Sequence, residues 1–110
     1  MEPSNETTTD ELLSVLADAR RRFVLHYLRR NGPTASVAEL ANHVAAWEAD
    51  ASVSDVSDGL VADVRTSLHH VHLPKLDDTD VVQWTDQHVR FDAGNETVSQ
   101  CLDIVVEFDR

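Results

Sequence analysis

The spacing of apolar residues predicts helices along most of the chain. Apolar positions recur at helical steps from Asp10 to about Arg30, which predicts one long amphipathic helix. Asn31-Gly32-Pro33 ends it, because glycine suits the left-handed position after a helix and proline cannot continue one. A second helix is predicted from Ser36 to about Glu48, because Ser36-Val37-Ala38-Glu39 has the form of a capping box. The first stripe consists of Leu12, Leu16, Ala19, Phe23 and Tyr27.

A third helix is predicted from about Ser57 to His72, after a small, acidic loop that is longer than a minimal helix-turn-helix turn. Val61, Val64, Leu68 and Val71 give this helix one apolar face. Pro74 lacks an N–H, so we expect the helix to kink or end there.

Two short runs follow, Val81-Val82-Gln83-Trp84 and His88-Val89-Arg90-Phe91, and their β-branched and aromatic residues predict a hairpin. A last helix is predicted from near Asn95, although the β-branched run Ile104-Val105-Val106 leaves a terminal strand as an alternative.

Three helices followed by a hairpin indicate a winged helix-turn-helix. The predicted fold class is therefore mainly α with a small β-hairpin, plus a C-terminal helix. We expect a disordered leader at 1–9, the winged domain at 10–92, and a C-terminal amphipathic helix at 93–110. Leu68 and Phe23 are expected in the core.

Two segments resemble a known group of proteins. Leu16-Ala17-Asp18-Ala19-Arg20-Arg21-Arg22-Phe23-Val24-Leu25 and His70-Val71-His72-Leu73-Pro74-Lys75-Leu76 are similar to small winged-helix domains abundant in haloarchaea, which are grouped with ArsR-type transcriptional regulators. The resemblance covers about residues 10–92 and implies a role in transcription. Metal-sensing ArsR proteins use cysteine pairs, and this chain has only Cys101, so metal sensing does not carry over.

The polar face of the third helix carries the candidate DNA-reading residues. A recognition helix at about 57–72 would enter the major groove, and the wing at 81–91 would touch the backbone. A guanidinium such as that of Arg65 recognises a guanine edge through two hydrogen bonds. The alternatives are a solvated helix face, an ordinary polar turn, and arginines that pair with the chain's own acids. The candidates are Arg65, Thr66, His69 and His70 on the helix, Gln87, His88 and Arg90 in the wing, and Arg20 and Arg22 on the first helix.

The charge of the chain opposes DNA binding at ordinary salt. Twenty acids stand against nine bases, giving a net charge of −11, and Pro33 to Asp80 holds two bases and nine acids. Lys75 is the only lysine against eight arginines, and the acids are spread along the chain, which is typical of halophilic proteins. In molar salt the screening length falls to about 3 Å, so repulsion from phosphate weakens. The alternative function is a winged-helix interaction module that does not bind DNA.

Other classes of site find little support. His69 and His72 share a face, but metal sites need three or four ligands with a supporting shell. Asp77, Asp78 and Asp80 lie in a predicted solvated turn, and three glycines do not make a phosphate loop. We expect no enzyme activity, no cofactor and no metal. No apolar run approaches the roughly 18 residues that span a membrane, so a cytoplasmic location is expected.

The predicted C-terminal helix has an apolar stripe that indicates association with a partner. Val98, Leu102 and Val105 form an apolar stripe that needs a partner, so we expect a homodimer on double-stranded DNA, with a further protein partner as another possibility. The competing expectation is that the stripe folds back onto its own domain.

Overall fold

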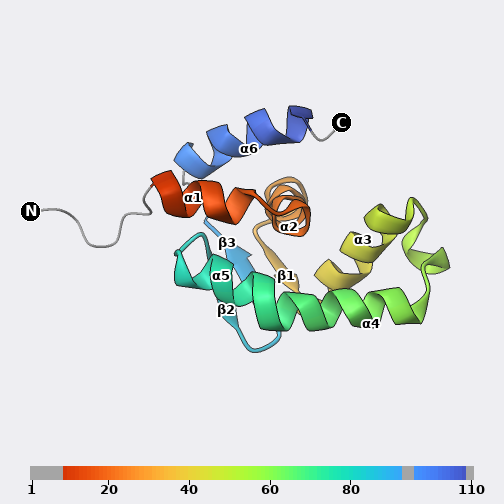
Figure 1. Ribbon diagram of the computed structural model, residues 1–110. Helices are drawn as coiled ribbons and strands as arrows, with labels where there is room; N and C mark the ends of the chain where they lie inside the picture. The colour runs from red at the N-terminus through yellow and green to blue at the C-terminus, as the bar shows by residue number, and fades with distance from the viewer. Residues whose placement is uncertain (1–8, 93–95, 109–110) are drawn as a thin grey trace, which may run out of the picture.

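The computed structural model (Figure 1) describes residues 9–92 and 96–108, with the side chains of the last helix described as far as Ile104. The predicted leader lies outside the described residues except for Thr9, which begins the first helix. The elements in chain order are α1 (Thr9–Leu16), α2 (Ala19–Asn31), β1 (Thr34–Ser36), α3 (Val37–Ala49), the 3-10 turn η1 (Val53–Asp55), α4 (Asp58–Ser67), the π-helical turn η2 (Leu68–His72), α5 (Leu73–Asp78), β2 (Val82–Thr85), β3 (His88–Phe91) and α6 (Glu96–Phe108).

The strands form a small antiparallel sheet in the order β1-β3-β2. The predicted hairpin is confirmed, with Val82 opposite Phe91 and Thr85 opposite His88. Strand β1 was not predicted, because three residues between two helices are too short to show an alternating pattern. The order of helices, β1 and hairpin gives a winged helix-turn-helix followed by a C-terminal helix, as the sequence predicts.

The first predicted helix is in fact two helices, so the prediction of one continuous helix is wrong. Asp18 interrupts it with an extended backbone, and its carboxylate accepts the backbone N–H groups of Arg20 at 2.8 Å and Arg21 at 3.3 Å. An aspartate cap satisfies N–H groups that a continuous helix would have bonded internally. The break changes which side chains face inward: Leu25 is fully buried, whereas Phe23 is half-buried against the core rather than inside it.

Helix α3 begins where the capping box predicts. The Ser36 hydroxyl accepts the backbone N–H of Glu39 at 3.0 Å, but the Glu39 carboxylate accepts the hydroxyl of Tyr27 from α2 instead of completing the box. Asp50 ends the helix in a left-handed conformation with φ of 53°, which aspartate tolerates better than most residues.

Pro74 does not end the third predicted helix. The turn before it widens into η2, in which the N–H of Leu73 bonds to the carbonyl of Leu68, and α5 continues to Asp78. A widened turn offsets the hydrogen bond that proline cannot donate. The helical segment therefore runs unbroken past the predicted stop.

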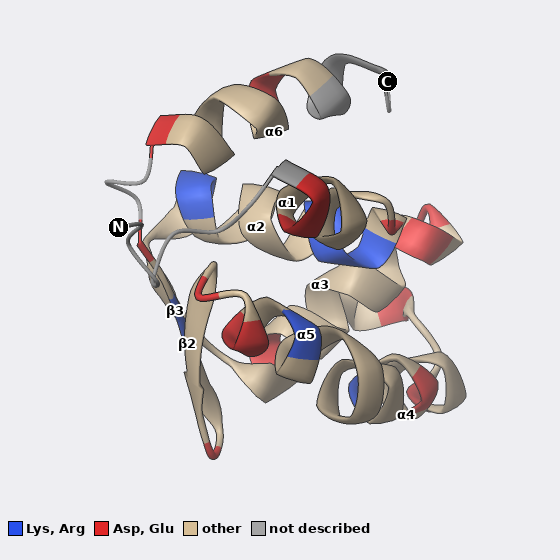
Figure 2. Ribbon diagram, turned by 60° about the vertical axis from the view of Figure 1, so that its left-hand side comes forward, with Lys and Arg blue, Asp and Glu red and all other residues tan. Residues whose placement is uncertain are grey.

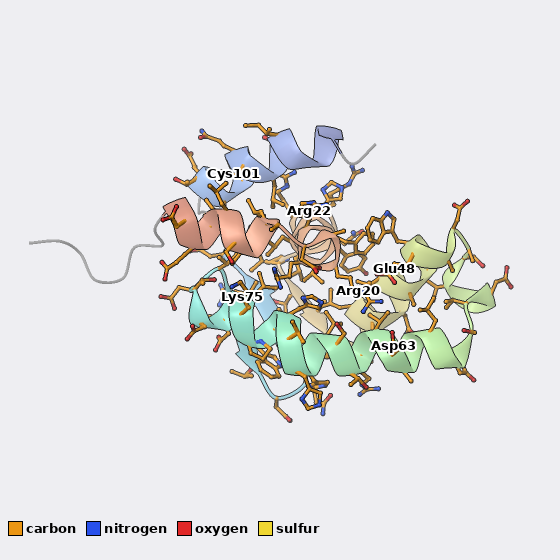
Figure 3. All side chains as sticks on the ribbon, viewed as in Figure 1. Arg20, Arg22, Glu48, Asp63, Lys75 and Cys101 are labelled. Carbon is orange, nitrogen blue, oxygen red and sulfur yellow. The ribbon has the colours of Figure 1, made fainter. Side chains whose placement is uncertain are left out.

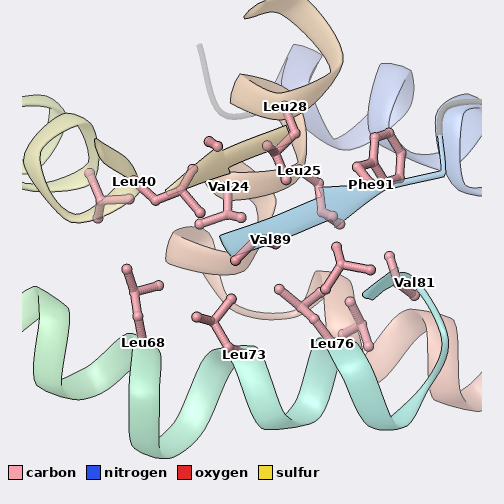
Figure 4. Close-up of a cluster of buried hydrophobic side chains, with 14 of the residues drawn as sticks. Val24, Leu25, Leu28, Leu40, Leu68, Leu73, Leu76, Val81, Val89 and Phe91 are labelled. Atoms are coloured by element: carbon pink, nitrogen blue, oxygen red, sulfur yellow. The ribbon is translucent and has the colours of Figure 1, made fainter. Parts of the chain in front are cut away.

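The core lies between this long helical segment, the sheet and α2. Leu68, Leu73 and Leu76 point from it toward Val89 and Phe91, and α2 closes the far side (Figure 4). All five of these side chains are 1 % exposed or less.

Helix α6 packs across α1 and α2 (Figure 1). Val98 and Leu102 are buried within the single chain, so they do not form the free dimerisation stripe that the sequence predicts. The same spacing is found in a helix that folds back onto its own domain. That competing expectation holds for Val98 and Leu102. Cys101 packs half-buried against the same core, and the side chain of Val105 lies outside those described.

We expect Leu68→Ala to lower the free energy of unfolding by about 2–5 kcal/mol, because it opens a cavity at the centre of this core. Urea denaturation followed by circular dichroism measures the loss. The matched control is Leu13→Ala on α1, which removes the same atoms from a side chain that is 60 % exposed and should cost less than about 0.5 kcal/mol. Equal losses in the two variants would contradict the burial of Leu68.

Candidate nucleic-acid interface

The outward face of α4 is polar and lies opposite its buried side. Ser57 caps the helix by accepting the N–H of Leu60 at 3.2 Å, and Val64 faces the core. Helical spacing then places Thr66 at the centre of the outward face and Arg65 toward one flank, and both are exposed. His70 is exposed in the following turn. The predicted helix residues therefore come together on one accessible surface.

The wing is attached to this surface through an aromatic contact. The ring of His69, four residues after Arg65, meets the ring of Trp84 edge-on, with centroids 5.8 Å apart and an interplanar angle of 60°. His69 is half-buried as a result. The Trp84 indole N–H also donates to the carbonyl of Asp86 in the turn, at 3.1 Å. The sequence analysis did not single out Trp84, although its alternation with Val82 places it on the inner face of the hairpin.

Two of the three predicted wing residues lie at the tip of the hairpin. Gln87 in the turn and His88 at the start of β3 are exposed, and the carbonyl of Gln87 accepts the N–H of Val37 at 2.8 Å, which ties the turn to the start of α3. Arg90 is not at the tip. It lies on the outer face of the sheet, opposite Gln83 and Thr34, so it does not share the surface of Arg65 and His69.

The arginines of α2 are engaged inside the chain. Arg20 binds Glu48 through two hydrogen bonds of 2.5 and 2.8 Å, and it lies 3.8 Å from Asp63 (Figure 3). Arg22 donates to the carbonyl of Leu16 at 2.8 Å. The alternative that these arginines pair with the chain's own groups therefore holds for Arg20, and neither guanidinium is free in the way that backbone contacts to DNA require. The cause is proximity, because the break at Asp18 and the acids of α3 and α4 surround the start of α2.

Arg65 differs from the α2 arginines. Within the described part of the chain its side chain forms no hydrogen bond and no ion pair. Figure 2 shows acids at the hairpin tip and at the end of α5, with basic residues on α4 and on the α2 side. Arg65 shares α4 with the exposed Asp58 and with Asp63, which lies 3.8 Å from Arg20 but keeps 73 % of its side chain exposed, and Asp86 is exposed at the hairpin turn. The α4 face is therefore acidic on balance, in a chain whose net charge is −11.

A buried polar cluster joins α1, α2 and η2 behind the exposed face of α4. Arg21 donates to the carbonyl of Val15 at 2.7 Å, to the carbonyl of Ser14 at 3.0 Å and to Nδ1 of His72 at 3.1 Å. Since arginine only donates, His72 accepts at Nδ1 and carries its proton on Nε2, which lies 3.9 Å from the Asp18 carboxylate. Among the residues that the structure describes, no three His, Cys, Asp or Glu side chains are grouped as metal ligands.

Burial lowers the pKa of His72, and Arg21 and Arg20 lower it further, whereas Asp18 and Glu48 oppose this effect. Burial would raise the pKa of Asp18, but His72 and the N–H groups of Arg20 and Arg21 outweigh it, so that pKa is lowered. His72 is therefore neutral in the folded protein near pH 7.

No helix in the described ranges is long and apolar enough to cross a membrane. Comparison with protein families matches residues 13–98 to the family described as Domain of unknown function (DUF7344). Comparisons with curated proteins and with solved structures give no match.

We expect the protein to lose stability as the pH falls below about 6.5, because the folded pKa of His72 lies below its unfolded value and protonation then favours the unfolded chain. Thermal melts in matched buffers from pH 7.5 to 5 measure the slope of the thermal midpoint against pH. His72→Asn, which keeps a side-chain acceptor for Arg21, should show a shallower slope; part of the slope remains, because burial also lowers the pKa of His26. His88→Asn, at an exposed position, is the control. Identical slopes for all three proteins would contradict the assignment.

Proposed function

The chain belongs to the DUF7344 family, and we propose that it is a DNA-binding transcriptional regulator of the cytoplasm of a halophilic archaeon. In this proposal residues 57–72 enter the major groove and the hairpin at 81–91 lies against the backbone. The observation that carries it is the outward face of α4, where Arg65, which has no partner among the described residues, lies beside Thr66 and the ring of His69 contacts Trp84 of the wing. The resemblance of 16–25 and 70–76 to haloarchaeal winged-helix regulators supports the same proposal.

The geometry suits base reading by few residues. An α-helix fits the major groove of B-form DNA, and arginine binds guanine O6 and N7 through two parallel bonds. Arg65 has no bond within the described chain to give up before it makes such a contact. Thr66 and His70 flank it as further donors or acceptors. The rigid link between His69 and Trp84 fixes the angle at which the hairpin would meet the backbone.

The electrostatics favour a contact that depends little on counterion release. Most DNA-binding proteins gain affinity by neutralising phosphates with Lys and Arg, and lose it as salt rises. Here Arg20 is occupied by Glu48 and Asp63, and Arg22 is bonded to the α1 carbonyl. A face with one cation among exposed acids therefore relies on base contacts, and molar salt in the cell would screen those acids.

The proposed regulator works as a homodimer through the α1–α6 side. Leu13 on α1 and Ile104 on α6 are each 60 % exposed, and these two helices pack against each other. Exposed leucine and isoleucine on adjoining helices favour association with a second copy. A dimer would read two half-sites about 34–36 Å apart. The second candidate function, a protein-interaction module without DNA binding, rests on these same exposed residues.

We expect Arg65→Ala to weaken binding to the best promoter fragment by roughly 1–3 kcal/mol and to relax its sequence preference, because a two-bond base contact is lost. Fluorescence anisotropy with genomic promoter fragments, across a range of KCl concentrations, measures both. Arg30→Ala is the matched control, since Arg30 is an exposed arginine of α2 away from the α4 face. For the parent we expect a flat or rising dependence on salt.

If no fragment binds at any salt while the protein stays folded, the interaction module replaces the regulator. If Arg30→Ala weakens binding as much as Arg65→Ala, the contact is a general charge effect and α4 does not read bases.

We expect the parent to sediment as a dimer at micromolar concentration in high salt, and the double variant Leu13→Asp/Ile104→Asp as a folded monomer, because buried carboxylates oppose an apolar interface. Val71→Asp, at a residue 52 % exposed on the recognition segment, should remain dimeric. A parent that is monomeric throughout would remove the dimer from the proposal.

A further inference from the structure

A row of aromatic rings follows the exposed seam between α2 and α3. Trp47 stacks on Phe23 with centroids 5.0 Å apart and an interplanar angle of 25°, and Phe23 lies 6.3 Å from Tyr27 at 21°. Tyr27 in turn meets the ring of His43 at 4.6 Å. We call these four residues the aromatic seam. Sequence periodicity places Phe23 and Tyr27 on one apolar stripe, and Phe23 is predicted in the core, but all four rings of the seam are partly accessible.

Trp47 is the most accessible ring of the seam, with 43 % of its surface exposed. Phe23 covers one face of the indole, so the exposed area includes the opposite face. Val53 in η1, which packs against α3, is 39 % exposed. A large aromatic ring and a valine left open together mark a surface that gains free energy when a partner covers it.

The charge around the seam is entirely negative apart from the arginines of α2. Between Arg30 and Arg65 the chain holds six acids and neither lysine nor arginine. Two of these acids border the seam and are already engaged, since Glu48 binds Arg20 and Glu39 accepts the Tyr27 hydroxyl. Burial, followed by Glu39, raises the pKa of Tyr27 to about 12, so the hydroxyl stays a donor. Asp50, directly after α3, is exposed.

We propose that the aromatic seam docks a basic, partly apolar segment of another protein, with a guanidinium or ammonium group on the open face of Trp47. Cations bind the faces of aromatic rings, and tryptophan is the best receptor among them. The exposed acids that follow α3, Asp50 and Asp55, supply the complementary charge, and Val53 receives an apolar neighbour.

The other occupants fit less well. Nucleic acid binds aromatic rings in company with cations that meet its phosphates, and α3 with the following turn, which carry Trp47 and Val53, hold neither lysine nor arginine. The residues before α1 include Glu2 and Glu6 and no base, so that segment has the wrong charge. The seam also lies on the α2–α3 side, whereas Arg65 and Thr66 lie on the outward face of α4. The inference therefore stands apart from the proposed DNA contact.

The test is a titration of isotope-labelled protein with a short blocked peptide that alternates arginine and leucine, followed by two-dimensional nuclear magnetic resonance. The counterpart with glutamate in place of arginine is the peptide control. We expect the indole signal of Trp47 to shift and that of Trp84 to stay, and we expect Trp47→Ala to weaken binding about tenfold. Gln100→Ala, at an exposed position of α6, is the control variant and should bind like the parent.

Equal binding of the glutamate peptide, or an unchanged affinity of Trp47→Ala, would overturn the proposal. Shifts confined to the α4 face would overturn it as well. If the Trp47 signal moves on simple dilution without peptide, a second copy covers the seam and the basic partner is wrong. Trp47→Ala also removes the stacked contact with Phe23, so its thermal midpoint is measured beside its affinity, and the variant should remain folded at the temperature of the titration. A Trp47→Phe variant with intermediate affinity separates lost stacking from lost folding.

Discussion

The buried guanidinium of Arg21 joins the end of α1 to His72, which lies 51 residues after Arg21 in the chain. It fills the space between the end of α1 and the π-helical turn, and its donors reach two α1 carbonyls and one ring nitrogen of His72. A charge taken from water needs such partners, because an unpaired one costs several kcal/mol. The bonds are possible only because Asp18 breaks the first helical region and turns its last carbonyls toward α2. The cap at Asp18 therefore helps to set the position of η2 relative to α1 and α2.

The sequence pattern predicted those elements of the fold that depend on the spacing of residues near one another in the chain. The hairpin, the start of α3 at Ser36 and the last helix follow from residues that are near neighbours in the chain. Asp80 has a left-handed backbone with φ of 63°, which its own short side chain tolerates without a distant contact. Such features were predictable because no distant contact is required to form them.

The features that the sequence did not reveal depend on tertiary partners. The stop at Asp18 competes with a continuous helical pattern, and it prevails because Arg21 finds acceptors across the break. Pro74 is accommodated because Leu68, Leu73 and Leu76 are all held by the core, which keeps the widened helix in place. The displacement of Arg90 from the wing tip follows from strand register, which a hairpin pattern leaves open by one or two residues. Trp84 belongs to the candidate site because its ring contacts that of His69, and a contact between residues this far apart in the chain has no local sequence pattern.

The distribution of cations explains the character of the surface. A chain with nine bases and twenty acids has few cations to place, and the structure assigns Arg20, Arg21, Arg22 and Arg29 to bonds within the domain. These bonds join α2 to α1, α3, η2 and α6, so the arginines act as internal connectors of a small core. What remains outside is an acidic surface on which Arg65 is exposed on α4 and the aromatic seam is partly exposed on α2–α3. The two places differ in chemistry: the first presents a guanidinium donor, and the second presents aromatic rings. The bonds that hold most of the arginines inside the domain therefore leave a surface that is not uniform, although its net charge is strongly negative.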